Sequence, residues 1–203
     1  MAAPILTQKK FWIVKPKAGR NELWNPRFDP PEGVTYWTGT NASLSLTGEE
    51  TRRNAYSMRV TPVSGTAGTA YYKRGLKVTN GLKYTFSCDV KGVAGQPMRI
   101  VIATSTGTAR ATKTFTATGY WQRIEVTLLA TETVTNYRVQ VTRDAVSSTL
   151  PFYVDGVQFE QTDKATTFIS GWEGDGYSWE GASRNSASDR KSTRLNSSHV
   201  SQS

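Results

Sequence analysis

The chain has 203 residues, of which 37% are hydrophobic and 20% are charged, with 25 Lys and Arg residues against 16 Asp and Glu residues. A single cysteine, Cys88, excludes an internal disulfide framework, and with the single histidine, His199, it cannot complete a structural zinc site of the Cys/His kind. No apolar run approaches the roughly 20 residues that cross a membrane, and the apolar stretch at residues 11–14 is a poor secretion signal. These counts indicate a globular chain of one or two domains with no membrane insertion.

The positive charge is concentrated at the two ends. The formal net charge of +9 would by itself suggest a polyanionic partner. Residues 1–21 carry +5 and residues 189–203 carry +2, which leaves only +2 for residues 22–188. We interpret residues 1–22 as an irregular basic arm. Its lysines flank Phe11 and Trp12, a combination that can bind nucleic acid strands, but docking in a larger assembly is the favoured interpretation.

The middle of the chain predicts β-strands. Residues 84–90, 98–102, 124–128 and 137–141 place an apolar side chain at every second position and are rich in β-branched and aromatic residues. This period is typical of strands with one face on a core and one in water. We therefore expect an all-β fold with about nine strands, arranged as an antiparallel β-sandwich or barrel. Cys88 shares the parity of Tyr84 and Phe86, which predicts a buried, unreactive thiol.

Catalytic signatures are sparse in this pattern. The only histidine lies near the C-terminus, and the acids are scattered rather than paired as glycoside hydrolysis requires. We expect no catalytic residues. The scattered acidic residues are Asp89, Glu125, Asp144, Asp155 and Glu160.

Short motifs in residues 23–162 resemble, in their order, the jelly-roll carbohydrate-binding modules related to families 4, 9 and 22. Residues 25–29 (Asn-Pro-Arg-Phe-Asp) are similar to the opening segment of those modules, and residues 81–87 (Gly-Leu-Lys-Tyr-Thr-Phe-Ser) to their Gly-x-x-Tyr-x-Phe-Ser hairpin. Residues 152–160 (Phe-Tyr-Val-Asp-Gly-Val-Gln-Phe-Glu) are similar to their closing strand. The resemblance implies a jelly roll over residues 23–162 and a polysaccharide or cell-surface glycan as its partner.

A Gly/Trp/Ser-rich extension follows at residues 163–188. Its sequence from Gly171 to Gly181, followed by alternating serines, resembles the tail found after such modules in bacteriophage tail and minor structural proteins. This implies a tail-associated virion module, located in the virion or extracellularly, with other virion proteins as partners. The alternative is an accessory module of a truncated polysaccharide-degrading enzyme. Trp172 and Trp179 are expected either at an interface or packed at the sandwich edge.

Alternation also predicts which side chains face outward. In a jelly roll, the outer side of one sheet can form a shallow cleft for sugars. Aromatic, Arg, Gln and carboxylate side chains suit a sugar, although any solvated sheet face has a similar composition. The candidate ligand-binding residues are Asp89, Arg99, Arg138, Gln140 and one of the neighbours Tyr71 and Tyr72.

A structural calcium ion is a further expectation from the resemblance. In related jelly rolls, calcium is held between the first and last strands by carboxylate and carbonyl oxygens, which suit a hard cation. Asp29 and Asp155 match those two segments. Alternatively, Asp29 is a turn residue before Pro30-Pro31, and Asp155 begins an Asp-Gly bend.

Residues 189–203 need separate treatment. Their first eleven residues, Asp-Arg-Lys-Ser-Thr-Arg-Leu-Asn-Ser-Ser-His, are similar to the conceptual translation of a short-read sequencing adapter. We expect this segment to be disordered and to contribute nothing to the fold. The natural chain would then continue beyond residue 188.

Overall fold

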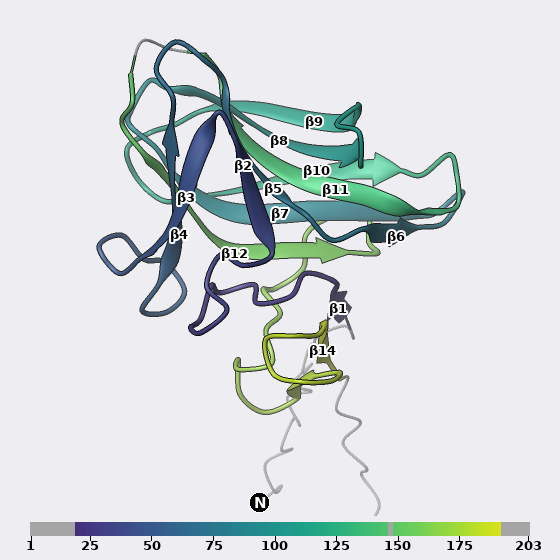
Figure 1. Cartoon of the computed structure of the whole chain (residues 1–203). Helices are drawn as coiled ribbons and strands as arrows, with labels where there is room; N and C mark the ends of the chain where they lie inside the picture. The colour runs from purple at the N-terminus through teal and green to yellow at the C-terminus, as the bar shows by residue number, and fades with distance from the viewer. Residues whose placement is uncertain (1–18, 146–147, 192–203) are drawn as a thin grey trace, which may run out of the picture.

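Two antiparallel sheets stacked face to face form the body of the molecule (Figure 1). The structure, a computed structural model, describes residues 19–145 and 148–191. The five-stranded sheet has the order β10 (Gln122–Leu129), β7 (Lys83–Lys91), β12 (Phe152–Glu160), β4 (Ser57–Pro62) and β3 (Ala42–Thr47). The six-stranded sheet has the order β2 (Trp37–Thr40), β5 (Gly68–Tyr72), β11 (Val134–Arg143), β8 (Pro97–Thr104) and β9 (Ala109–Thr116), and β6 (Leu76–Val78) also pairs with β11. The predicted all-β antiparallel sandwich is confirmed.

The core lies between the two sheets and is built by the alternation seen in the sequence. Phe86 and Cys88 of β7 are inaccessible to solvent, as are Ile100 of β8 and Val139 of β11. Each large apolar side chain removed from water in this way contributes about 1.5–3 kcal/mol to folding. The burial expected for Cys88 is confirmed, and that burial raises the pKa of its thiol.

A third, small sheet ties the two ends of the described chain together. It has the order β1 (Gly19–Asn21), β14 (Ser188–Arg190) and β13 (Tyr177–Trp179), with β1 and β14 side by side below the sandwich (Figure 1). Two of the expected segments therefore overlap strands, because residues 1–22 include β1 and residues 189–203 include most of β14. The expectation of disorder is wrong for Asp189 and Arg190, which pair with β1 and β13. Residues 1–18, with the lysines of the basic arm, and residues 192–203 lie outside the described residues.

The buried Asn21 side chain joins this small sheet to the sandwich. Its amide nitrogen donates to the carbonyl oxygens of Val157 (2.9 Å) and Ile169 (3.1 Å). Its amide oxygen accepts from the backbone N–H groups of Leu23 (3.1 Å) and Phe159 (3.0 Å). Four satisfied hydrogen bonds allow a polar amide to be fully buried at low cost.

Nothing in the described part of the chain forms a helix able to cross a membrane.

The two outer faces of the sandwich have different surroundings. On the five-stranded sheet, residues 161–170 pack over the outer side of β7 and β12. The Thr85 hydroxyl donates to the carbonyl oxygen of Thr162 at 2.9 Å, and the backbone N–H of Ile169 donates to Gln158 Oε1 at 2.7 Å. Phe168 is only 5% exposed. The outer face of the six-stranded sheet carries the partly exposed side chains of Tyr71, Arg99 and Arg138, and that face positions the candidate site.

Candidate functional site

Four of the predicted ligand-binding residues lie on the outer face of the six-stranded sheet. Tyr71 of β5 is directly opposite Gln140 of β11. Arg138 lies two residues before Gln140 on the same strand, so its side chain is on the same face. Arg99 of β8 is opposite Thr142, which is two residues after Gln140. The structure thus brings Tyr71, Arg99, Arg138 and Gln140 together.

The centre of this cluster is a stacked arginine. The Arg138 guanidinium lies 4.2 Å from the centroid of the Tyr71 ring, a cation–π contact that fixes its plane. With its amide oxygen turned toward Arg138, Gln140 accepts hydrogen bonds from Nε at 2.8 Å and from Nη2 at 3.1 Å. Gly107 also lies close, because a Cβ there would be 2.6 Å from Arg138 Nη2. The guanidinium is therefore held in one orientation before any ligand arrives.

Arg99 lies farther along the same face and is paired differently. Its Nη1 forms an ion pair and hydrogen bond with Asp144, which follows β11. Both side chains remain about one-third exposed, at 37% for Arg99 and 32% for Asp144. This pair can present a donor and an acceptor to a hydroxyl-rich ligand.

The middle of the face carries two buried apolar side chains. Val101 and Ala103 of β8 are 3% and 0% exposed, yet they are outside the core cluster and pair with Gln140 and Arg138. Thr112 and Thr114 of the edge strand β9 are exposed. A hollow of about 240 Å³ lies where Tyr71 and Arg138 meet. Its lining includes Tyr71, Lys73, Arg74, Ser105, Tyr137 and Arg138.

Tyr72 belongs to the interior rather than to this face. It is 1% exposed, and its ring packs edge-on against Trp37 with the centroids 5.7 Å apart. Its hydroxyl accepts a hydrogen bond from the backbone N–H of Trp24 at 3.1 Å, and burial raises its pKa. Of the two tyrosines that alternation left open, Tyr71 is the outward one.

Asp89 is a correction to the predicted outward set. It faces away from the core as expected, but it lies on β7 of the other sheet and is 2% exposed. Its Oδ2 is 2.6 Å from Arg53 Nε and 3.3 Å from Arg123 Nη1. Phe168 lies against both guanidinium groups, with its ring centroid 4.9 Å and 5.8 Å from their Cζ atoms. Asp89 is thus a buried structural charge, which alternation within one strand could not distinguish from a ligand-binding one.

Two residues of the hollow, Lys73 and Arg74, were missed by the sequence analysis. They follow β5 directly and are exposed, and the Arg74 guanidinium lies 3.5 Å from the Trp24 ring centroid. Alternation could not find them because they lie beyond the end of the strand. The available signal was the pair of basic residues directly after Tyr71 and Tyr72.

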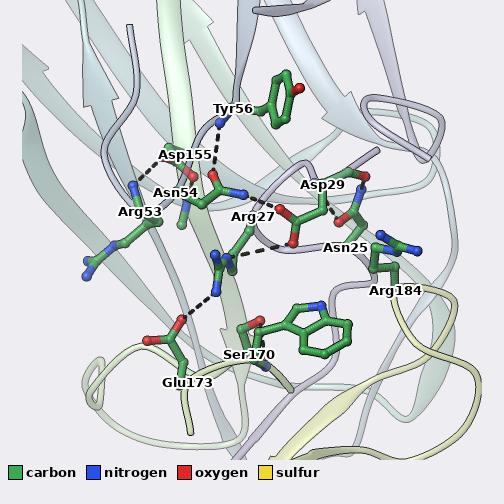
Figure 2. Close-up of polar contacts among 12 residues, drawn as sticks. Asn25, Arg27, Asp29, Arg53, Asn54, Tyr56, Asp155, Ser170, Glu173 and Arg184 are labelled. Atoms are coloured by element: carbon green, nitrogen blue, oxygen red, sulfur yellow. Dashed lines mark hydrogen bonds and ion pairs between the residues drawn. The ribbon is translucent and has the colours of Figure 1, made fainter. Parts of the chain in front are cut away.

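Asp29 and Asp155 lie on either side of one loop, as Figure 2 shows. Asp155 Oδ2 accepts from the backbone N–H groups of Arg52 (2.9 Å) and Arg53 (2.7 Å), and its Oδ1 accepts from that of Gly156 (2.6 Å). Asp29 accepts from the Asn54 side chain and lies 3.7 Å from Arg27. Desolvation raises the pKa of Asp155 to about 6, against the smaller lowering effect of its three N–H donors.

This donor set does not fit a calcium ion well. Nitrogen donors already occupy the oxygens of Asp155, and a cation would have to displace them. No group of three or more His, Cys, Asp or Glu side chains gathers to hold a metal within residues 19–145 and 148–191. The predicted calcium therefore stays a prediction, and hydrogen bonding accounts for the positions of both acids.

The two tryptophans of the extension differ in exposure. Trp172 is 54% exposed and borders an open hollow of about 410 Å³ together with Arg27, Pro30 and Arg184. Trp179 is partly buried against Gly171, where a Cβ would be 2.3 Å from its ring. Trp179 thus packs at the edge of the described structure, and an interface role for Trp172 stays a prediction.

The amino-acid sequence matches a known protein family. Residues 21–147, more than half of the chain, match the family model described as carbohydrate binding domain. No curated protein matches the chain in sequence.

Solved structures share the fold. An arabinose-bound GH51 α-L-arabinofuranosidase is 16% identical with a TM-score of 0.60, over 69% of this chain and 26% of that one. A Stig cyclase from Fischerella sp. TAU is 12% identical with a TM-score of 0.58, over 72% and 98% of the respective chains. A CBM4 structure is 12% identical with a TM-score of 0.54, over 64% and 98%. These likenesses confirm the predicted jelly roll, and this chain spans about a quarter of the arabinofuranosidase.

Proposed function

This chain belongs to the carbohydrate binding domain family, and we propose that it binds a polysaccharide on the outer face of the six-stranded sheet, with no catalytic role of its own. The observation that carries the proposal is the Tyr71, Arg138 and Gln140 cluster beside a hollow. Its side chains are held by one another before a ligand binds, which lowers the entropic cost of binding.

The chemistry of the face suits a sugar ring. The pyranose ring offers C–H groups that pack on an aromatic face and hydroxyls that pair with planar polar side chains. Tyr71 supplies the ring, while Arg138 and Gln140 supply donors and an acceptor. Water competes for every hydroxyl, so affinity depends on side chains held in position before binding, as Arg138 is by Tyr71 and Gln140.

Affinity gel electrophoresis with soluble plant and bacterial polysaccharides tests this proposal. We expect the chain to be retarded by at least one polymer and Tyr71→Ala to bind that polymer at least tenfold more weakly, about 1.4 kcal/mol. Tyr120→Ala is the matched control, because Tyr120 is 78% exposed and is not one of the residues of this face. Equal binding by Tyr71→Ala and the unaltered chain would place the site elsewhere.

For the larger context, we propose a tail-associated virion protein, in the virion or outside the cell, that contacts other virion proteins and host surface glycans. The support is the resemblance of residues 171–188 to the tails that follow such modules in phage proteins. Residues 177–179 of that segment form β13, which pairs with β14.

The second candidate is an accessory module of a polysaccharide-degrading enzyme. It is favoured by the arabinofuranosidase, whose chain contains this fold as about a quarter of its length. The uninterrupted reading frame and its neighbouring genes separate the two contexts. Phage tail genes next to this reading frame would support the virion protein. A hydrolase domain encoded in the same reading frame would support the enzyme accessory module.

A further inference from the structure

We propose that the hollow at Tyr71 selects an acidic polysaccharide, one with uronate carboxylates, through Lys73, Arg74 and Arg138. This inference rests on the proposed function and names the class of polymer. Three chain segments meet at this hollow: the end of β5, the turn between β8 and β9, and β11. Gly75 lets the first segment lie against β11, because a Cβ there would be 2.3 Å from the carbonyl oxygen of Thr135.

The charge in this hollow is unbalanced. Its lining contains Lys73, Arg74 and Arg138 and no acid. Several cations elsewhere in the described residues are paired with carboxylates, as in Arg53 with Asp89 (2.6 Å) and Lys91 with Glu50 (2.6 Å). Among the ion pairs of the described residues, none includes the three cations of the hollow.

Nearby acids are engaged with other groups. Glu132 accepts from the hydroxyl of Tyr137 at 2.7 Å, and its Oε1 lies 3.5 Å from Arg110 Nη2. Glu32 lies 3.1 Å from Arg184 Nε. Neither of these acids forms an ion pair with a cation of the hollow, and like charges held together favour an anionic ligand.

The two guanidinium groups are also oriented. Arg74 lies over Trp24 with 3.5 Å between Cζ and the ring centroid, and Arg138 lies over Tyr71 at 4.2 Å. An aromatic face holds each guanidinium plane. Gln140 already accepts from Nε and Nη2 of Arg138, so the donors left for a carboxylate are Nη1 of Arg138 and the N–H groups of Arg74. Lys73 adds an exposed ammonium group. A uronate unit bound in the hollow beside Tyr71 would present its carboxylate to these donors.

The experiment compares polygalacturonate with the same polymer after reduction of its carboxyl groups, by isothermal titration calorimetry at low and high NaCl. We expect the acidic polymer to bind at least tenfold more tightly in 20 mM NaCl, about 1.4 kcal/mol, and this advantage to shrink at 500 mM NaCl. Arg138→Gln and Arg74→Gln should each reduce the advantage at least threefold, while Arg138→Lys should retain part of it.

Lys113→Gln is the matched control, since Lys113 is an exposed cation of β9 that alternates away from the outer face. All variants share the basic residues 1–21, so a difference between them reports the hollow. Thermal melting checks that each variant is folded. An equal loss in Lys113→Gln would overturn the inference in favour of attraction by net charge.

The remaining outcomes separate the inference from the proposed function. If both polymers bind equally and binding depends on Tyr71, the preference for acid is overturned and the polysaccharide site remains. If the chain binds no polymer from the earlier panel and neither form of polygalacturonate, the proposed function fails. Tight binding of the acidic polymer that is lost in Arg138→Gln but kept in Lys113→Gln supports both.

Discussion

Individual buried charges in this molecule are held by hydrogen bonds that the local sequence does not reveal. Asp155 is fully buried, yet three backbone N–H groups from Arg52, Arg53 and Gly156 point at its carboxylate. Desolvation still dominates and raises its pKa to about 6, from an ordinary value of 3.8. A folded-state pKa above the unfolded one means that the native state binds this proton more tightly, so the protonated form favours folding.

Stability should therefore fall as pH rises from about 4 to about 6, because above that range the folded state carries a buried charge. A shift of about two pKa units corresponds to roughly 3 kcal/mol, which is an upper limit for one group. The measurement is the free energy of urea unfolding at several pH values. We expect this free energy to depend less on pH between about 4 and 6 in Asp155→Asn than in the unaltered chain. Burial also raises the pKa values of Glu22 and Asp29, so we expect these two residues to cause the pH dependence of stability that remains in Asp155→Asn. Parallel curves for the two proteins would contradict the raised pKa of Asp155.

Cys88 gives a second residue-scale prediction. Its side chain is inaccessible, and burial raises its pKa, so little thiolate forms at neutral pH. We expect a thiol reagent such as DTNB to label the folded protein at least a hundredfold more slowly than the protein in 6 M guanidinium chloride. Rapid labelling of the folded protein would show that β7 opens readily.

At the scale of elements, residues 161–170 convert one outer face of the sandwich into a second buried layer. Phe168 closes this layer over Arg53 and Arg123, which in turn neutralise Asp89. Arg123 also donates to the Ser87 hydroxyl at 2.7 Å and to the carbonyl oxygen of Gly156. The segment keeps water from a charged cluster whose members are all partly or fully buried.

Phe168→Ala should consequently destabilise the fold by about 3 kcal/mol, because it removes an apolar side chain that is 5% exposed and admits water to the Asp89 cluster. Chemical denaturation measures the change. Leu129→Ala is the control in the same sheet, since Leu129 of β10 is 55% exposed and its truncation should cost less than about 0.5 kcal/mol. Similar losses in both variants would mean that the segment does not stabilise the sheet.

The described residues form a sandwich in which residues 161–170 cover the outer face of one sheet, while the other sheet carries the Tyr71 and Arg138 pair on its outer face. Asn25, Asp29 and Asn54 link the opening segment to the loop after β3, and Asp155 of β12 receives the backbone of that loop (Figure 2). These hydrogen bonds join the first and last parts of the jelly roll. Since this linkage spans the sandwich, any ion bound there would act on global unfolding.

This arrangement predicts the outcome of metal removal. We expect the melting temperature of the whole chain to change by less than about 2 °C on addition of EDTA or of 5 mM calcium chloride, because the oxygens of Asp155 are already paired with N–H donors. Differential scanning calorimetry makes the measurement. A rise of several degrees with calcium, abolished in Asp29→Asn, would establish the calcium site instead.

Alternation in the sequence was sufficient to predict the all-β sandwich, because a strand with one buried face must place an apolar residue at every second position. It also identified Cys88 as buried and Arg99, Arg138 and Gln140 as outward, while it left open which of Tyr71 and Tyr72 faces outward. Alternation predicts that a side chain points away from the core. It does not predict which sheet contains the strand or which residues cover the side chain. Asp89 and Arg138 therefore look alike in sequence, and only the tertiary structure places one beneath Phe168 and the other on the outer face of the six-stranded sheet.

The same distinction applies to charge. The sequence by itself determined that the net charge of +9 lies mostly at the ends and that residues 22–188 are nearly neutral. Only the folded chain decides which charges are neutralised, because ion pairs such as Arg123 with Asp89 join residues far apart in sequence. Folding leaves Lys73, Arg74 and Arg138 together without an acid, since β5 and β11 are neighbours in the sheet though more than 60 residues apart in the chain. A nearly neutral domain thus acquires a positive hollow.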